Sequence, residues 1–155
     1  MRMAKNSTPE QLLKDLDSDD WSTRCAAAYH SNATPEVLLK AMEDGDGNVR
    51  RYAAENPNAT PQILTKAMEY EEWDIRCAAA SNPNATPDIL LKGMEDSDKE
   101  VRVSVIWNPN ATPQMLLNAL SDKDEWVRNS AEEKLQNYPL LQLQVAALRA
   151  QKAIS

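Results

Sequence analysis

Phenylalanine is absent from this chain of 155 residues, and glycine, cysteine and histidine number only three, two and one. The scarcity of glycine, beside many Ala, Leu, Glu and Asp residues, favours helix over sheet. No apolar run approaches the ~18 residues that a membrane-spanning helix needs, and the N-terminal stretch "MRMAKNSTPEQ" lacks the apolar segment of a signal peptide. We therefore expect an all-α, cytoplasmic protein with no membrane segment.

Positive charge is also limited, because 17 Lys and Arg residues face 24 Asp and Glu residues and the formal net charge is -7. Contacts with phosphates need a basic surface, so this balance disfavours nucleic acids and anionic membranes as partners. The same charge favours solubility and a basic partner.

What the sequence does contain is a repeat with a period of 26 residues. The pair Thr-Pro recurs at 8–9, 34–35, 60–61, 86–87 and 112–113, and an arginine follows the same period from Arg24 to Arg128. Such a period indicates a stacked array in which each unit buries its apolar face against its neighbours. Positions 26 residues apart are called a column below.

Each unit is predicted to hold two helices. In the second unit, Thr34 caps a first helix that begins at Pro35, and Asp46 caps a second helix that ends before Pro57. The residues expected to face inward are Val37, Leu38, Ala41, Met42, Val49, Tyr52 and Ala53. The recurring "NPNATP" is therefore interpreted as the turn between units, and its Asn-Ala-Thr triplet is not expected to be glycosylated in the cytoplasm.

Two units carry closely similar motifs, "NPNATPQILTKAM" with "DIRCAAASNPN" and "NPNATPDILLKGM" with "VRVSVIWNPN". Through these motifs the chain resembles the variant leucine-rich repeat family over residues 6 to about 135. The resemblance implies a right-handed, HEAT-like superhelix that binds other macromolecules. One helix of each unit can be a 3₁₀-helix in that family, but these units are longer, which leaves the helix type open. Some members also hold an iron–sulfur centre in an N-terminal cysteine cluster, which this sequence lacks.

Residues suited to catalysis or metal binding are few. His30 is the only histidine, and it occupies the column held elsewhere by Asn56, Asn82 and Asn108, which predicts a role in the turn. Cys25 and Cys77 share a column two units apart, about 20 Å at the usual helix spacing, which is too far for a disulfide. We predict no catalytic residues, no metal, no cofactor and no enzyme activity.

The positions that differ most between units lie on one face of the second helix, four residues apart. This variable stripe consists of Trp21, Cys25, Tyr29; Gly47, Arg51, Glu55; Trp73, Cys77, Ser81; Lys99, Val103, Trp107; and Glu125, Asn129, Glu133. Tryptophan, tyrosine and arginine dominate binding hot spots, which predicts a partner-binding surface made of Trp21, Tyr29, Arg51, Trp73 and Trp107. The alternative, that the tryptophans seal gaps between units, is left open.

Two further features involve charge. Each arginine of the column follows an acidic residue by four positions, which predicts an ion pair within each second helix, with each arginine also able to reach the neighbouring unit. Carboxylates near the ends of the first helices oppose the helix dipole and indicate an acidic ridge that a basic partner would recognise. The predicted ridge consists of Glu43, Asp44, Glu69, Glu71, Glu95 and Asp96.

The predicted architecture is a right-handed α-solenoid of five 26-residue, two-helix repeats over residues 6–138, followed by a C-terminal capping helix or tail over 139–155. Its predicted function is a non-catalytic scaffold for another protein. Two alternatives remain, a nucleic-acid-associated HEAT-like module and a protein that self-associates through the tail. The oligomeric state is accordingly predicted as a monomer or a weak homodimer through that tail.

Overall fold

The computed structural model describes residues 6–154. Residues 1–5 of the stretch inspected for a signal peptide, and Ser155 of the predicted tail, lie outside the described residues. Within that range the chain forms eleven α-helices and no strands, which confirms the all-α prediction. Both helices of each unit are α-helices, a point that the sequence leaves open.

The helices alternate along the chain. The first helices are α1 (Pro9–Asp15), α3 (Pro35–Ala41), α5 (Pro61–Ala67), α7 (Pro87–Met94) and α9 (Pro113–Ala119). The second helices are α2 (Trp21–Tyr29), α4 (Gly47–Glu55), α6 (Trp73–Ser81), α8 (Lys99–Trp107) and α10 (Glu125–Asn137), and α11 (Pro139–Ile154) follows them.

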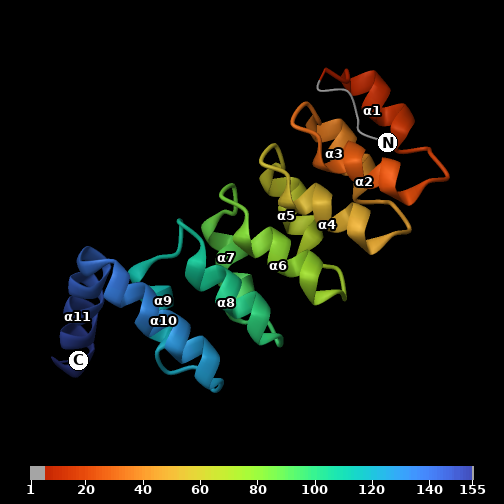
Figure 1. Ribbon diagram of the computed structural model, residues 1–155. Coiled ribbons are helices and arrows are strands. Elements are labelled where there is room, and N and C mark those ends of the chain that lie inside the picture. Colours follow the sequence, from red (N-terminus) through yellow and green to blue (C-terminus); the bar gives the residue numbers. More distant parts are fainter. Residues whose placement is uncertain (1–5, 155) are drawn as a thin grey trace.

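The units are arranged as an elongated array with the two ends of the chain at its opposite ends (Figure 1). First helices follow one side of the array and second helices the other. Each second helix packs more extensively against the next second helix than neighbouring first helices pack against each other. This helix-on-helix packing is consistent with a helical repeat.

The helices begin where the capping residues predict. The hydroxyl groups of Thr8, Thr34, Thr86 and Thr112 accept bonds from backbone N–H groups of the first helices, each of which has proline in its first turn. Carboxylates cap four of the second helices in the same way, at Asp20, Asp46, Asp98 and Asp124. In the described part of the chain, the third unit differs, because neither Thr60 nor Glu72 makes a side-chain cap bond.

The predicted core is confirmed with one exception. All of the inward residues predicted on the first helix of the second unit are fully buried, as are Val49 and Ala53 on its second helix. Tyr52, also predicted to point inward, is only partly buried. It reaches the surface of the second helices, where its ring forms part of the candidate site described below.

Close packing between the two helices of a unit depends on small residues that face each other. In the fourth unit Gly93 replaces the alanine that Ala41, Ala67 and Ala119 supply in the same column. A Cβ atom on Gly93 would lie 2.5 Å from Cγ2 of Val105, which is itself the one valine in a column of alanines. The loss of one methyl group on α7 therefore compensates for the larger side chain on α8.

The turns between units are fastened by buried asparagines. The Nδ2 group of Asn82 donates to the carbonyl oxygens of Ala54 and Asn56, at 2.8 and 3.0 Å, and its Oδ1 accepts from the backbone N–H of Asn84. Asn56 and Asn108 make the same bonds one unit earlier and one unit later. The amide suits this position because it donates and accepts at once.

His30 and Lys134 occupy the two ends of this asparagine column. Nδ1 of His30 accepts from the backbone N–H of Asn32 at 3.0 Å, which confirms its predicted role in the turn. Nζ of Lys134 donates to the carbonyl oxygens of Ile106 and Asn108, at 2.7 and 2.9 Å, and its burial lowers the pKa of the ammonium group. An ammonium group can replace the asparagine here because α10 continues to Asn137, so no turn begins at this position and no side-chain acceptor is required.

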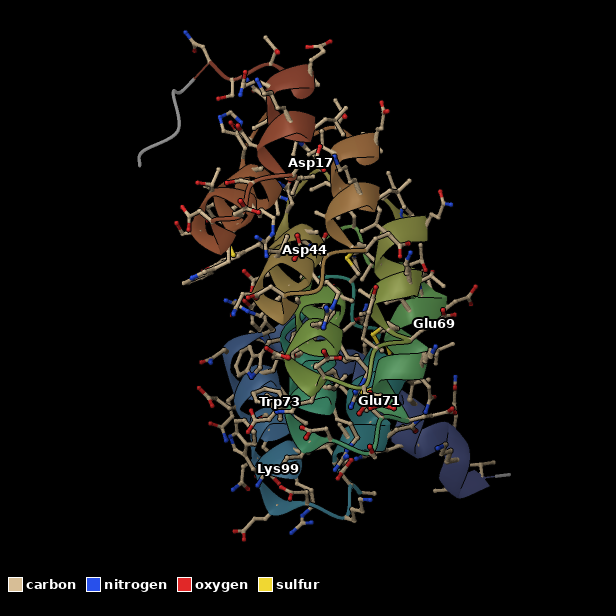
Figure 2. All side chains as sticks on the ribbon, turned by 90° about the vertical axis from the view of Figure 1, so that its right-hand side faces the viewer. Asp17, Asp44, Glu69, Glu71, Trp73 and Lys99 are labelled. Carbon is tan, nitrogen blue, oxygen red and sulfur yellow. The ribbon has the colours of Figure 1, made fainter. Side chains whose placement is uncertain are left out.

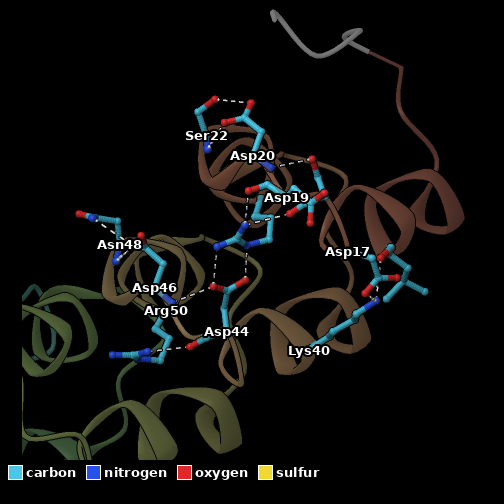
Figure 3. Close-up of polar contacts among 12 residues, drawn as sticks. Asp17, Asp19, Asp20, Ser22, Lys40, Asp44, Asp46, Asn48 and Arg50 are labelled. Carbon is cyan, nitrogen blue, oxygen red and sulfur yellow. Dashed lines mark hydrogen bonds and ion pairs between the residues drawn. The ribbon is translucent and has the colours of Figure 1, made fainter.

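The arginine column forms ion pairs between units, which confirms the predicted reach to the neighbouring unit, whereas the predicted pairs within each second helix do not form among the described residues. Arg76 pairs with Asp96 of the next unit through Nε at 2.7 Å and Nη2 at 3.0 Å, and its Nη1 binds the carbonyl oxygen of Tyr70. Arg24 with Asp44, and Arg102 with Asp122, repeat this geometry. Figure 3 shows the contacts at the carboxylate of Asp44 as dashed lines. The acidic residues four positions before the arginines instead lie at the N-caps of the second helices.

The joint between the second and third units differs from the others. Tyr70 stands in the column of Asp44, Asp96 and Asp122, and the guanidinium of Arg50 lies 5.0 Å from the centre of its ring. Arg50 pairs with Glu72 instead, and within the described chain its buried Nε has no hydrogen-bond partner. Replacement of the aspartate by tyrosine thus converts a bidentate ion pair into a cation–π contact.

Helix α11 begins 26 residues after α9, at Pro139, and therefore starts at the position of a further first helix. It packs on α9 and α10, with Val145 buried and Leu141 and Leu148 partly buried against the cluster that contains Leu116 and Leu135. The described part of the predicted tail is thus a helix that covers the end of the array.

Candidate functional site

The face formed by the second helices carries exposed aromatic side chains. The exposed fractions are 54% for Trp21, 62% for Tyr29, 49% for Trp73 and 40% for Trp107. Figure 2 shows Trp73 and Lys99 on one side of the stack and Glu69 on the other. Half-exposed tryptophans at three of the five second helices give this face a large amphipathic contact surface.

The three columns of the variable stripe differ in depth. In the first four units the middle column lies lowest, because Cys25 and Val103 are buried and Arg51 and Cys77 are half-buried, whereas Asn129 in the last unit is exposed. The two flanking columns carry the exposed aromatic residues at opposite ends of the second helices. The predicted stripe is therefore a shallow floor between two rows of more exposed side chains.

A groove of about 430 Å³ lies between α2 and α4 at one end of this floor. It is lined by Cys25, Ala26, Tyr29, Tyr52 and Glu55. The rings of Tyr29 and Tyr52 meet edge to face, with their centres 5.6 Å apart and their planes at 67°. A pair of tyrosines beside a carboxylate offers apolar area together with hydrogen-bonding groups.

Tyr52 was missed as a site residue because its helical position suggests a core residue. Its column elsewhere holds only small side chains, Ala26, Ala78, Ser104 and Ser130. A tyrosine does not fit between closely packed second helices, and its ring therefore extends to the surface. The contrast within this column is the signal that identifies the groove from sequence.

Arg51 is held beside the groove by its own neighbours. Its guanidinium lies 4.5 Å from the centre of the Tyr52 ring and forms an ion pair with Glu55 one turn later. Partial burial disfavours the charged form, but Glu55 and Tyr52 together outweigh this effect and the pKa of Arg51 is raised. The positive charge of Arg51 is therefore already balanced within the groove.

The acidic ridge divides into structural and exposed carboxylates. Asp44 and Asp96 have side chains only 9% and 8% exposed, and both bind arginines of the preceding unit. Glu43 is exposed and forms an ion pair with Lys66. The remaining members, Glu69, Glu71 and Glu95, are exposed, so they are the carboxylates most accessible to a partner on this edge.

Burial opposes ionisation of Asp96, but hydrogen bonds from Arg76 and from the backbone N–H of Asp98 outweigh it and lower its pKa. Asp122 follows the same pattern, with Arg102 and the backbone N–H of Asp124 as its donors. These carboxylates therefore remain charged at neutral pH and act as permanent partners of the arginines.

The two cysteines are free thiols, buried at Cys25 and half-buried at Cys77. Burial raises the pKa of Cys77 to about 11, so its thiol stays protonated and weakly nucleophilic at neutral pH. Among residues 6–154, no group of three or more His, Cys, Asp or Glu side chains is arranged to hold a metal ion. The same range contains no helix that is long and apolar enough to span a membrane.

No protein-family model matches this chain, and no curated protein matches it either.

Proposed function

We propose that this protein is a non-catalytic scaffold that binds another protein through its second-helix face. The binding residues are Trp21, Tyr29, Arg51, Trp73 and Trp107, with Tyr52 added from the groove between α2 and α4. The observation that carries the proposal is the exposure of four large aromatic residues on one face, in a chain with only eight aromatic residues. Exposed Trp and Tyr on rigid helices are typical of binding hot spots.

The charge of the chain favours a basic partner. Arg51 and Lys99 are the stripe residues that carry positive charge, and each lies within 4 Å of a carboxylate, of Glu55 and Asp124 respectively. The chain as a whole carries a net charge of -7. An approaching cationic segment is therefore attracted by the overall field and by the exposed carboxylates Glu69, Glu71 and Glu95.

The same proposal assigns the architecture in finer detail. The residues point to a right-handed α-solenoid of five two-helix repeats, similar to the variant leucine-rich repeat family, in a cytoplasmic protein. The inter-unit bonds of Asn56, Asn82 and Asn108 support such a stack, because each recurs with the 26-residue period. The alternative of a nucleic-acid module is weakened by the ion pairs of Arg24, Arg76 and Arg102.

Capture of partners from the lysate of the source cell tests the proposal. The bait is compared with the double variant Trp21→Ala/Trp73→Ala and with Trp126→Ala, a matched control that is 42% exposed but lies outside the stripe. We expect a protein that binds the wild type and Trp126→Ala but not the double variant. Its purified form should lose about tenfold or more in affinity for each tryptophan removed.

The same set of captured proteins from the wild type and the double variant would contradict the proposal. A partner whose binding falls steeply with salt and that proves to be nucleic acid would favour the alternative instead.

A further inference from the structure

Helix α11 has a second apolar face that packs on nothing within the described chain. One face, with Leu141, Val145 and Leu148, packs against α9 and α10. The opposite face carries an outer stripe of apolar residues, namely Leu140, Leu143, Ala147, Ala150 and Ile154. Leu140 and Leu143 are each 69% exposed, and Ile154 is 89% exposed. A helix that only covered the end of the array would be polar on this side.

Two columns of the repeat show that part of this face is specific to α11, although the column of Leu143 also holds leucine in four earlier units. Leu140 stands in the column of Glu10, Glu36, Gln62, Asp88 and Gln114. Ala147 stands in the column of Asp17, Glu43, Glu69, Glu95 and Ser121. Positions that are polar in every earlier unit thus become apolar in α11, where they add exposed apolar surface that the fold does not use.

The spacing of the residues in the outer stripe indicates which kind of structural element covers it. Its members follow one another at intervals of three, four, three and four residues, which is the a/d pattern of a coiled coil over two heptads. A strict 3.5-residue period keeps such a seam against another helix that runs nearly along the same axis. The occupant is therefore a helix rather than a loop or a flat surface.

We infer that the outer stripe of α11 pairs with the outer stripe of a second copy, antiparallel, about a two-fold axis near Ala147. In that arrangement Leu140 lies opposite Ile154 of the second copy, and Leu143 lies within one residue of the level of Ala150, where the two side chains meet. Large side chains thus meet small ones beside the axis, and the two alanines at position 147 allow close approach. A two-fold interface requires such self-complementarity.

A parallel pair fits less well, since Leu143 would meet Leu143 while the alanines at 147 and 150 left a gap. The only charged residues of α11, Arg149 and Lys152, lie away from the seam and favour neither direction. The positions that flank the seam carry no charge, so they oppose neither arrangement. They are Gln144, Ala146, Gln151 and Ala153.

The surface available to the second copy extends beyond the stripe. A groove of about 390 Å³ between α9 and α11 adjoins Ala147 and is lined by Thr112, Pro113, Gln114, Gln144, Leu148 and Gln151. Even so, five residues of one helix form a small interface, at the lower end of specific association. We therefore expect a dimer that dissociates on dilution.

Sedimentation equilibrium of the full chain tests this inference. A concentration series up to roughly 0.5 mM covers the concentrations at which weak dimers form. The wild type should approach twice its monomer mass of 17.3 kDa. Leu143→Glu should remain monomeric, because it places two charges in the seam. The matched control Leu91→Glu changes the equivalent leucine two units earlier, 52% exposed, and should dimerise like the wild type.

A wild type that stays monomeric throughout the series would overturn the inference, and so would a dimer that survives Leu143→Glu. Circular dichroism of both glutamate variants shows whether each remains folded. The direction of pairing is tested by oxidation of single cysteine variants. Ala147→Cys should form a disulfide-linked dimer readily, whereas a Leu140→Cys variant that links more efficiently would contradict the antiparallel arrangement.

Discussion

The turns between units keep the same residue in successive repeats, whereas the exposed face of the second helices changes its residues from one repeat to the next. In the turns, Asn56, Asn82 and Asn108 keep one residue type and one set of bonds in successive units. On the second-helix face, one column changes from Trp21 through Gly47, Trp73 and Lys99 to Glu125. The difference indicates that the units are held together by buried residues that recur, and that the exposed positions are free to specialise for binding.

The largest effect is expected from breaking the turn. Asn82→Ala removes two hydrogen bonds to carbonyl groups of the preceding unit and one bond from Asn84, all at a buried position. Buried polar groups left without partners cost about 1–3 kcal/mol each, so the free energy of unfolding should fall by about 3 kcal/mol or more. Urea denaturation followed by circular dichroism measures this loss.

Asn84→Ala is the matched control, because Asn84 bonds two carbonyl groups of the preceding unit from an exposed position. Water can replace these bonds, so its cost should stay near 1 kcal/mol. Equal losses for the two variants would show that burial of the asparagine column is not what fastens the units.

A smaller effect is expected where two helices of one unit meet. Gly93→Ala places a methyl group 2.5 Å from Cγ2 of Val105 and should cost about 1–3 kcal/mol by overpacking. The double variant Gly93→Ala/Val105→Ala restores the alanine pair of other units and should recover part of the loss. A double-mutant cycle of unfolding free energies measures the coupling, and strictly additive losses would rule out the proposed compensation.

The ion pairs between units should make the free energy of unfolding depend on pH in the acidic range. The pKa of Asp96 is lowered in the folded chain, so its stabilising effect is complete above the unfolded pKa and is lost as pH falls through the folded pKa. Asp96→Asn should lower the unfolding free energy by about 2 kcal/mol at neutral pH. The gap between variant and wild type should close as pH falls through the lowered pKa of Asp96 in the folded chain, and a gap independent of pH would contradict the assignment.

Much of the fold could be predicted from the sequence, because local signals repeat. Thr-Pro pairs and capping aspartates fixed most helix starts, and the apolar arc on the first helix of the second unit is fully buried as predicted. The predicted stripe residues Trp21, Tyr29, Trp73 and Trp107 lie together on one face because a 26-residue period keeps each column in register.

Features that depend on contacts between units were harder to predict. The sequence indicates that the arginines can reach the neighbouring unit, but the i, i+4 rule points to a carboxylate of the same helix, whereas Arg76 pairs with Asp96, twenty residues later. Tyr52 and Tyr70 stand in columns of smaller or charged residues, and only three-dimensional packing shows what such an exchange does. The acidic ridge likewise combined structural carboxylates such as Asp44 with exposed ones.

The smallest effect on stability is expected on the second-helix face. The unfolding free energy of Trp21→Ala/Trp73→Ala tests most directly whether these tryptophans are surface residues available for binding. Both side chains are about half exposed, so each substitution should cost about 1 kcal/mol or less, whereas Ile75→Ala, at a fully buried position of α6, should cost about 2–5 kcal/mol. A loss of about 3–5 kcal/mol for each tryptophan would mean that the indole rings pack between units, and would contradict their assignment to binding.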